Sequence, residues 1–241
     1  NNSFILNLSG MAYQRLDKNH RAINFFELAL KADNTNIAVM NNLANSFKNI
    51  EQYFKAEQIY KKIIKIDPNY INTYNNYGNL KSEINDIENA IKLYNQGLNF
   101  AKEKNINPLV FLNHLAVALQ SLNKVTETIE ATNKILEIDP KNANAHQILS
   151  SIYKYSLTNE ETMIHISKMK KILSENNFED DQEGIISFAL GKAYDDLKDS
   201  EEAIKFLCLG NKIMNKKRNS NIAEEINIMN DMKSTFESID L

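Results

Sequence analysis

Asparagine side chains recur in this sequence in a regular pattern that could serve binding chemistry. The stretches VMNNLANSFK and TYNNYGNLKS both contain Asn-Asn-x-x-Asn, and the matching asparagines lie 34 positions apart. A carboxamide is both a hydrogen-bond donor and an acceptor, so it can hold the backbone of an extended peptide without reading its side chains. The predicted peptide-binding residues share this spacing or lie beside it: Asn7, Asn41, Asn42, Asn45, Asn75, Asn76, Asn79, Asn113, His114 and Gln120.

The alternative explanation for these asparagines is composition. Asparagine accounts for 36 of the 241 residues, and it also fills expected loops such as KNINP and SENN. A solvated surface needs some polar residue, and a biased composition would supply asparagine there. The sequence leaves both explanations open; the shared register in consecutive segments is the argument for a functional row.

No catalytic, metal or cofactor site is expected from the sequence. The four histidines occur singly, without a Cys, His or acidic partner at metal-ligand spacing: His20, His114, His146 and His165. His146 falls where a packing aromatic is expected, so we predict a buried core imidazole. The acidic stretch EDDQE lacks the alternating ligands and central glycine of a calcium loop. Because glycine-rich phosphate loops and nucleophile turns are also missing, the chain is not expected to be an enzyme.

The bulk composition favours long helices around a buried core. Hydrophobic residues make up 43% of the chain and charged residues 24%, which is enough to bury a core. Only six glycines and three prolines occur, which favours helices joined by short connections. A net charge of −3 gives no general attraction to nucleic acid or to anionic membranes, so neither is an expected partner.

Cysteine usage and hydropathy suggest where the protein resides. The one cysteine, Cys208, cannot form an internal disulfide, which suits a reducing compartment. Its neighbours in AIKFLCLG are apolar, so we expect a buried thiol. No apolar run approaches the ~18 residues of a membrane span, and no signal peptide is visible. We therefore expect a cytoplasmic protein with no membrane partner.

The elements that must position the asparagines are marked by large-small residue pairs. These pairs recur at intervals of 34 residues or slightly more: Ser9-Gly10, Leu43-Ala44, Tyr77-Gly78, Leu115-Ala116, Leu149-Ser150 and Leu190-Gly191. Twelve positions after each small member lies another, mostly small residue: Ala22, Ala56, Ala90, Thr128, Thr162 and Ala203. Small residues let two helices approach closely, and each segment carries apolar stripes at helical spacing. A segment of this kind cannot bury its apolar face alone, so neighbouring segments must stack.

This pattern resembles the tetratricopeptide repeat over nearly the full length of the chain. The fold that the resemblance implies is all-α: a right-handed superhelical α-solenoid of about six helix-turn-helix repeats with a C-terminal capping helix. We expect a single domain over residues 1–241. The expected bounds of the repeats and then of the capping helix are about 3–36, 37–70, 71–104, 109–142, 143–176, 184–217 and 220–240. Thr128 and Thr162 replace the usual alanine, so the fourth and fifth helix pairs match the pattern least closely.

The resemblance also implies how such a protein works. In this family the first helices of the repeats line a concave groove that binds a peptide or a partner protein. The asparagine rows are similar to the asparagine ladder in the repeat domain of O-linked N-acetylglucosamine transferases, where that row holds extended peptide. Further polar candidates for the groove are Lys48, Lys154, Tyr155 and Lys192. The positions of a chaperone carboxylate clamp hold no cation, so that mode of binding is not expected.

Two other functions stay open from the sequence. Residues 188–218 resemble the final repeat of bacterial proteins in which tetratricopeptide repeats precede a sulfotransferase domain. That likeness implies a substrate-recruiting or oligomerisation arm, with the catalytic domain following Leu241. The other possibility is a structural role as a homo-oligomer. The leading prediction is a non-catalytic protein-interaction scaffold.

Overall fold

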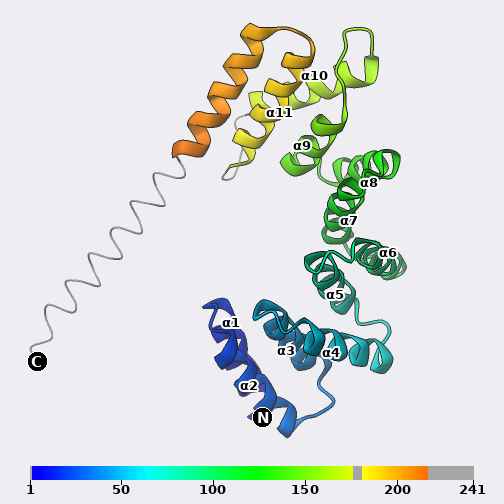
Figure 1. Ribbon diagram of the computed structural model, residues 1–241, viewed down its shortest axis with the longest axis vertical. Coiled ribbons are helices and arrows are strands. Elements are labelled where there is room, and N and C mark those ends of the chain that lie inside the picture. Colours follow the sequence, from blue (N-terminus) through cyan, green and yellow to red (C-terminus); the bar gives the residue numbers. More distant parts are fainter. Residues whose placement is uncertain (1, 176–180, 217–241) are drawn as a thin grey trace, which may run out of the picture. The chain divides into compact units, whose positions relative to one another are not determined.

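The computed structural model describes residues 2–175 and 181–216, and every regular element within these ranges is a helix (Figure 1). The predicted all-α helical repeat fold is therefore confirmed. The chain divides into two compact units, Asn1–Ala131 and Thr132–Leu241, which we call unit 1 and unit 2. Among the described helices, none combines the length and apolar character that a membrane-spanning helix requires.

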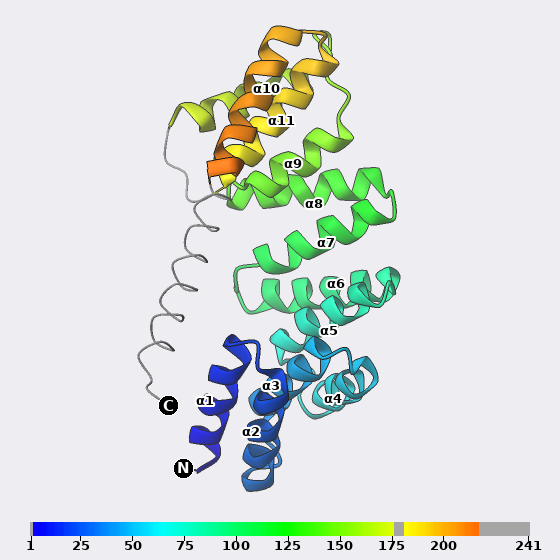
Figure 2. The same ribbon diagram turned by 60° about the vertical axis from the view of Figure 1, so that its left-hand side comes forward.

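Unit 1 is built from helical hairpins. Its helices are α1 (Asn2–Arg15), α2 (Asn19–Ala32), α3 (Ile37–Asn49), α4 (Tyr53–Ile66), α5 (Ile71–Glu83), α6 (Ile87–Glu103), α7 (Leu109–Ser121) and the first part of α8 (Val125–Ile138). Helices α1 and α2, α3 and α4, and α5 and α6 pack as pairs. Each pair also packs on the next, so that α1, α3, α5 and α7 form one row of neighbouring helices (Figure 2).

Small side chains lie where paired helices touch, as predicted. Gly10 faces the ring of Phe26, and Gly78 faces the ring of Tyr94, so closely that a Cβ on either glycine would overlap the ring. The small members of the other pairs and the residues twelve positions later are buried as well. Close helix approach therefore depends on these positions, because a larger side chain would push the two backbones apart.

The turns inside the hairpins share one backbone conformation. A single residue with positive φ connects the two helices of the first, second, third, fourth and sixth repeats: Asp17, Glu51, Asn85, Asn123 and Lys198, with φ between 54° and 64°. This left-handed residue makes a short reversal of the chain possible. The fifth repeat has no such residue within the described chain, and its turn is different.

Unit 2 contains the end of α8, then α9 (Ala143–Ile152), α10 (Glu160–Ser174), α11 (Gln182–Asp196) and a further helix over residues 200–216. Helix α9 has 10 residues, whereas α3, α5 and α7 each have 13. It packs closely on α11, and the backbones of α9 and α10 do not pair as closely as those of the earlier hairpins. The fifth helix pair is thus irregular.

Two expectations on the C-terminal side need comment. Cys208 is exposed, so the prediction of a buried thiol is wrong. Helix 200–216 buries Ala203, Phe206 and Gly210, which share one face, and Cys208 lies on the opposite face. The expected capping helix at 220–240 lies outside the described residues. The single-domain and repeat boundaries stay predictions.

Candidate functional site

The two asparagine rows are joined by hydrogen bonds between successive repeats of unit 1. Asn42 Nδ2 donates to Asn7 Oδ1 at 3.2 Å, linking α3 to α1. One repeat later, Asn76 Nδ2 donates to Asn41 Oδ1 at 3.2 Å and links α5 to α3. Both bonds span 35 residues, one more than the sequence period, because each joins the first row of one repeat to the second row of the next.

His114 takes the place of the second-row asparagine in the fourth repeat. Its Nδ1 lies 2.8 Å from Asn75 Oδ1, across 39 residues because the chain carries a short insertion before α7. A carbonyl oxygen only accepts, so the neutral imidazole carries its proton on Nδ1 and leaves Nε2 as an acceptor. The ring stacks on Tyr94 at 5.4 Å between centroids, and burial lowers the pKa of His114.

The structure separates the residues of the two rows into two kinds. Asn41 is only 5% exposed, and its Oδ1 accepts a second bond from Thr73 Oγ1 at 3.4 Å, so it serves the contact between α3 and α5. A second set stays half-buried and reaches solvent: Asn7, Asn42, Asn75, Asn76, Asn113 and His114. We call this second set the amide face.

Asn45 and Asn79 anchor buried tyrosines. Tyr60 OH donates to Asn45 Oδ1 at 2.5 Å, and Tyr94 OH donates to Asn79 Oδ1 at 2.8 Å. A buried hydroxyl needs an acceptor, and in the first repeat Phe26 has no hydroxyl and Met11 replaces the asparagine. The choice of Asn at this position therefore follows the choice of Tyr fifteen residues later.

Each hydrogen bond between repeats uses either the oxygen or the nitrogen of a carboxamide, and the other group stays available. Within the described residues, Asn42 Oδ1 and Asn76 Oδ1 have no partner, and neither does the Nδ2 of Asn75. With His114 Nε2, the amide face therefore presents acceptors and a donor at successive repeats. These are the two kinds of group that an extended peptide backbone can pair with.

Two of the three charged candidates are already engaged, and the third, Lys154, is exposed. Lys48 pairs with Glu83 at 2.5 Å, and Lys192 pairs with Asp196 at 2.6 Å. Tyr155, which we expected at the groove, is buried instead, because α9 ends at Ile152 and the following segment turns inward. Gln120 is half-buried near the end of α7 and already has an interaction partner in the structure.

A charged cluster between α4 and α5 was not foreseen. Glu57 accepts a hydrogen bond from Tyr77 OH at 2.8 Å and pairs with Lys61 at 2.8 Å and Lys81 at 3.1 Å. Burial works against the charged carboxylate, but these three donors outweigh it and lower the pKa of Glu57 to about 2. The only sequence signal is the spacing of Glu57 and Lys61, a helical ion pair.

The sequence suggested that the histidines are isolated, but two of them meet in the structure. His146 on α9 and His165 on α10 face each other, with His146 Nδ1 2.9 Å from His165 Nε2. Tyr155 OH lies 2.6 Å from His165 Nδ1, and His146 Nε2 lies 3.0 Å from the carbonyl of Pro140. At 1% exposure, His146 confirms the predicted buried imidazole.

One proton arrangement satisfies this chain with both rings neutral. Tyr155 donates to His165 Nδ1, His165 Nε2 donates to His146 Nδ1, and His146 Nε2 donates to the Pro140 carbonyl. Burial lowers the pKa of both imidazoles, that of His165 to about 3. Every ring nitrogen is thus engaged, and residues 2–175 and 181–216 contain no cluster of three or more groups that could hold a metal ion.

These features define an all-α helical repeat scaffold with a polar face. Models of the tetratricopeptide repeat match residues 5–36, 37–70 and 186–213, and a second model of the same repeat matches 59–92. These segments are tetratricopeptide repeats. The match over 186–213 is to the repeat in general, so the likeness to sulfotransferase arms stays a prediction.

Similar proteins support the same architecture. The uncharacterized protein ycf37 of Porphyra purpurea is 34% identical over 60 residues, which are 25% of this chain and 35% of that protein. The chain thus spans about a third of the length of this curated relative. The structure of pilF from Pseudomonas aeruginosa has a TM-score of 0.66 at 15% identity, covering 85% of this chain and 88% of that one.

A second solved structure is YrrB, described as a TPR protein with an unusual peptide-binding site. Its TM-score is 0.59 at 14% identity, and the match covers 83% of this chain and 97% of YrrB. At such low identity the two structural likenesses show the fold alone.

Proposed function

We propose that this chain is a non-catalytic interaction scaffold whose amide face binds an extended peptide segment of a partner protein. The observation that carries the proposal is the set of half-buried amide and imidazole groups left available at successive repeats of α3, α5 and α7. A peptide lying across these helices would exchange water for hydrogen bonds from its backbone.

The internal hydrogen bonds prepare the face for this task. Because Asn42, Asn76 and His114 are each held by the preceding repeat, their side chains lose little rotamer freedom on binding. Each new hydrogen bond contributes about 1 kcal/mol net. Useful affinity therefore requires several repeats to engage the same peptide.

The chemistry of the amide face also indicates which ligands it does not select. Lys48 is neutralised by Glu83, so the described part of the face offers no unpaired cation for a terminal carboxylate. Neutral amides favour an internal, extended segment over a free C-terminus. A peptide as ligand class also fits the description of YrrB, whose fold is similar.

Asn75 allows a test that spares the fold. The Asn75→Asp variant keeps the oxygen that accepts from His114 and removes the Nδ2 donor that faces solvent. The probe is a set of peptides selected on the full chain from a phage-displayed random library. Their Kd should rise about tenfold in Asn75→Asp, which corresponds to about 1.4 kcal/mol.

The matched control is Asn95→Asp, the same chemical change on the exposed side of α6. It should leave the Kd unchanged, and both variants should keep the circular dichroism spectrum of the parent. Equal binding by Asn75→Asp and the parent would contradict the proposed role of the amide face.

A further inference from the structure

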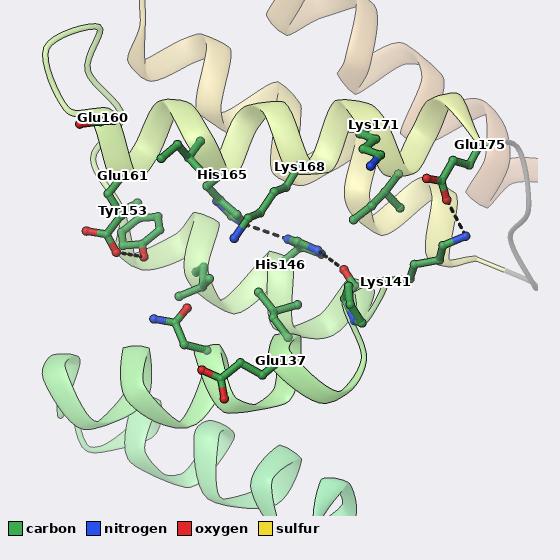
Figure 3. A pocket seen from close by; sticks show the side chains of 16 residues that line it. Glu137, Lys141, His146, Tyr153, Glu160, Glu161, His165, Lys168, Lys171 and Glu175 are labelled. Carbon is green, nitrogen blue, oxygen red and sulfur yellow. Dashed lines mark hydrogen bonds and ion pairs between the residues drawn. The ribbon is translucent and has the colours of Figure 1, made fainter.

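Unit 2 contains a pocket of about 860 Å³ between the end of α8, helix α9 and helix α10 (Figure 3). Leu136 comes from α8, Leu149 and His146 from α9, and Ile164 and Ile172 from α10. The volume falls within the range of ligand sites in proteins. The amide face lies on other helices, in unit 1, so the two features are separate.

The pocket exists because the fifth helix pair is open. Helix α9 ends early, and the segment after it is fastened to α11: Tyr155 N–H donates to Asp196 at 3.0 Å, and the Lys192 ammonium donates to the carbonyl of Tyr153. The same lysine pairs with Asp196 at 2.6 Å. These contacts hold α9 against α11 and leave space between α8 and α10.

The histidines on the floor of the pocket leave no ring nitrogen free for a ligand. His146, 1% exposed, and His165, 4% exposed, have all ring nitrogens engaged in the chain of hydrogen bonds described above. Leu149 and Ile172 are buried beside them, and Ile164 on the wall is 48% exposed. An exposed isoleucine beside a buried apolar floor favours the binding of an apolar partner.

The shape of the pocket fits a helix. Its lining on α10 extends from Glu160 to Glu175 at spacings of one helical face. At 1.5 Å per residue this stripe is about 22 Å long, the length of about four helical turns. A trough walled by two helices and floored by a third receives an amphipathic helix through its apolar stripe.

The charges around the pocket are arranged by position along α10. Glu175 is paired with Lys141 at 2.7 Å, and Glu161 accepts from Tyr153 OH at 2.6 Å. Within the described residues, Lys168 and Lys171 make no ion pair, although both line the pocket. Figure 3 shows Glu160 and Glu161 near one end of α10 and the two lysines further along it. A partner must therefore be basic at one end and acidic along the rest.

We propose that this pocket binds an amphipathic helix of a partner protein, independently of the peptide on the amide face. The apolar stripe of that helix packs on Leu149, Ile164 and Ile172. Acidic side chains in one half of the helix face Lys168 and Lys171, and basic side chains in the other half face Glu160 and Glu161.

The proposal is tested with a designed peptide of about sixteen residues. It carries leucines at spacings of three and four, glutamates in its first half and lysines in its second half, and a fluorescent label. Binding to the full chain is measured by fluorescence polarisation. We expect saturable binding, and a version with glutamine at every charged position should bind about tenfold more weakly.

Two exposed isoleucines give a matched pair of variants. Ile164→Asp places a charge on the wall of the pocket, whereas Ile204→Asp makes the same change on helix 200–216, where the isoleucine is 61% exposed. Both should fold, because neither side chain is buried. The first should lose binding by tenfold or more, and the second should match the parent chain.

Charge reversal completes the test. Changing Lys168→Glu together with Lys171→Glu should abolish binding of the designed peptide, and a peptide with lysines in both halves should restore it. Equal binding by the two aspartate variants, failure of this rescue, or tight binding of a fatty acid that the peptide does not displace would each overturn the proposal. Asn75→Asp should leave binding here unchanged, so failure of the amide face is recognised separately.

Discussion

Acid should destabilise unit 2 through its buried histidine pair. The folded chain holds both rings neutral, because protonation would give the ring a second N–H, at the nitrogen that already accepts a bond from Tyr155 or from the other ring. An unfolded chain binds those protons freely at the ordinary histidine pKa of 6.5. Lowering the pH therefore favours the unfolded state.

The size of the effect follows from the pKa shift of His165. Its pKa in the folded chain is lowered to about 3, chiefly by burial and further by His146 and Lys168. A depressed basic pKa means that its contribution is fully present above pH 6.5 and is lost as the pH falls towards about 3. Because one pH unit corresponds to about 1.4 kcal/mol, His165 alone should cost about 2 kcal/mol between pH 8 and pH 5. His146, whose pKa is also lowered, adds to this loss.

The assay combines urea unfolding with NMR. Unfolding of unit 2 is followed through the amide signals of α9 and α10 at pH 8 and pH 5, since the two units need not unfold together. The imidazole signals are followed over the same range. The signal of His165 should not titrate between pH 8 and pH 5.

Variants test whether the pH dependence of stability comes from the pair of His146 and His165. His146→Leu with His165→Leu should lower stability at pH 8 but remove most of the pH dependence, whereas His20→Gln, on the exposed surface of α2, should leave the dependence as it is. If His165 titrates near pH 6.5, or if the double variant keeps the full slope, the account of the buried pair is wrong.

Two further predictions concern the contacts that build unit 1. Replacing Asn42→Ala together with Asn76→Ala removes two bonds between repeats and should lower the free energy of unfolding by about 2 kcal/mol, measured by urea titration; no change would mean that water replaces these bonds without loss. Replacing Gly78→Ala drives a methyl group into the ring of Tyr94 and should cost about 1–3 kcal/mol in a thermal melt. Gly184→Ala is the control, because the nearest atoms to its Cβ would belong to the side chains of Met214 and Ile213, at 3.3 Å and 3.4 Å, and stability should hold or rise.

The sequence was sufficient to predict the helical repeats for a simple reason. Gly78 and Ala44 mark helix crossings whatever the ligand, because only a small residue lets two backbones meet. The asparagine register was also visible. Neighbouring positions on a helix differ by about 100°, so the sequence could not say that Asn41 is buried while Asn42 reaches solvent.

The fifth repeat shows where sequence reasoning stops. His146 and His165 lie on different helices, and their meeting depends on the early end of α9, which no single residue announces. Thr162 in place of alanine marks a departure from the repeat pattern, but it does not predict this irregularity. The hydrogen bonds from Tyr155 N–H to Asp196 and from Lys192 to the carbonyl of Tyr153 form only once α9 packs on α11.

The central claim is that the amide face holds the backbone of a peptide. The most direct test uses one selected peptide and compares an alanine scan with an N-methyl scan, both read out as Kd on the full chain. Alanine substitutions should change the Kd by less than about threefold, and N-methylation of bound residues should raise it about tenfold, since each lost bond costs about 1 kcal/mol or more. Tolerance of N-methylation, with binding lost on replacing one or two side chains, would contradict the account.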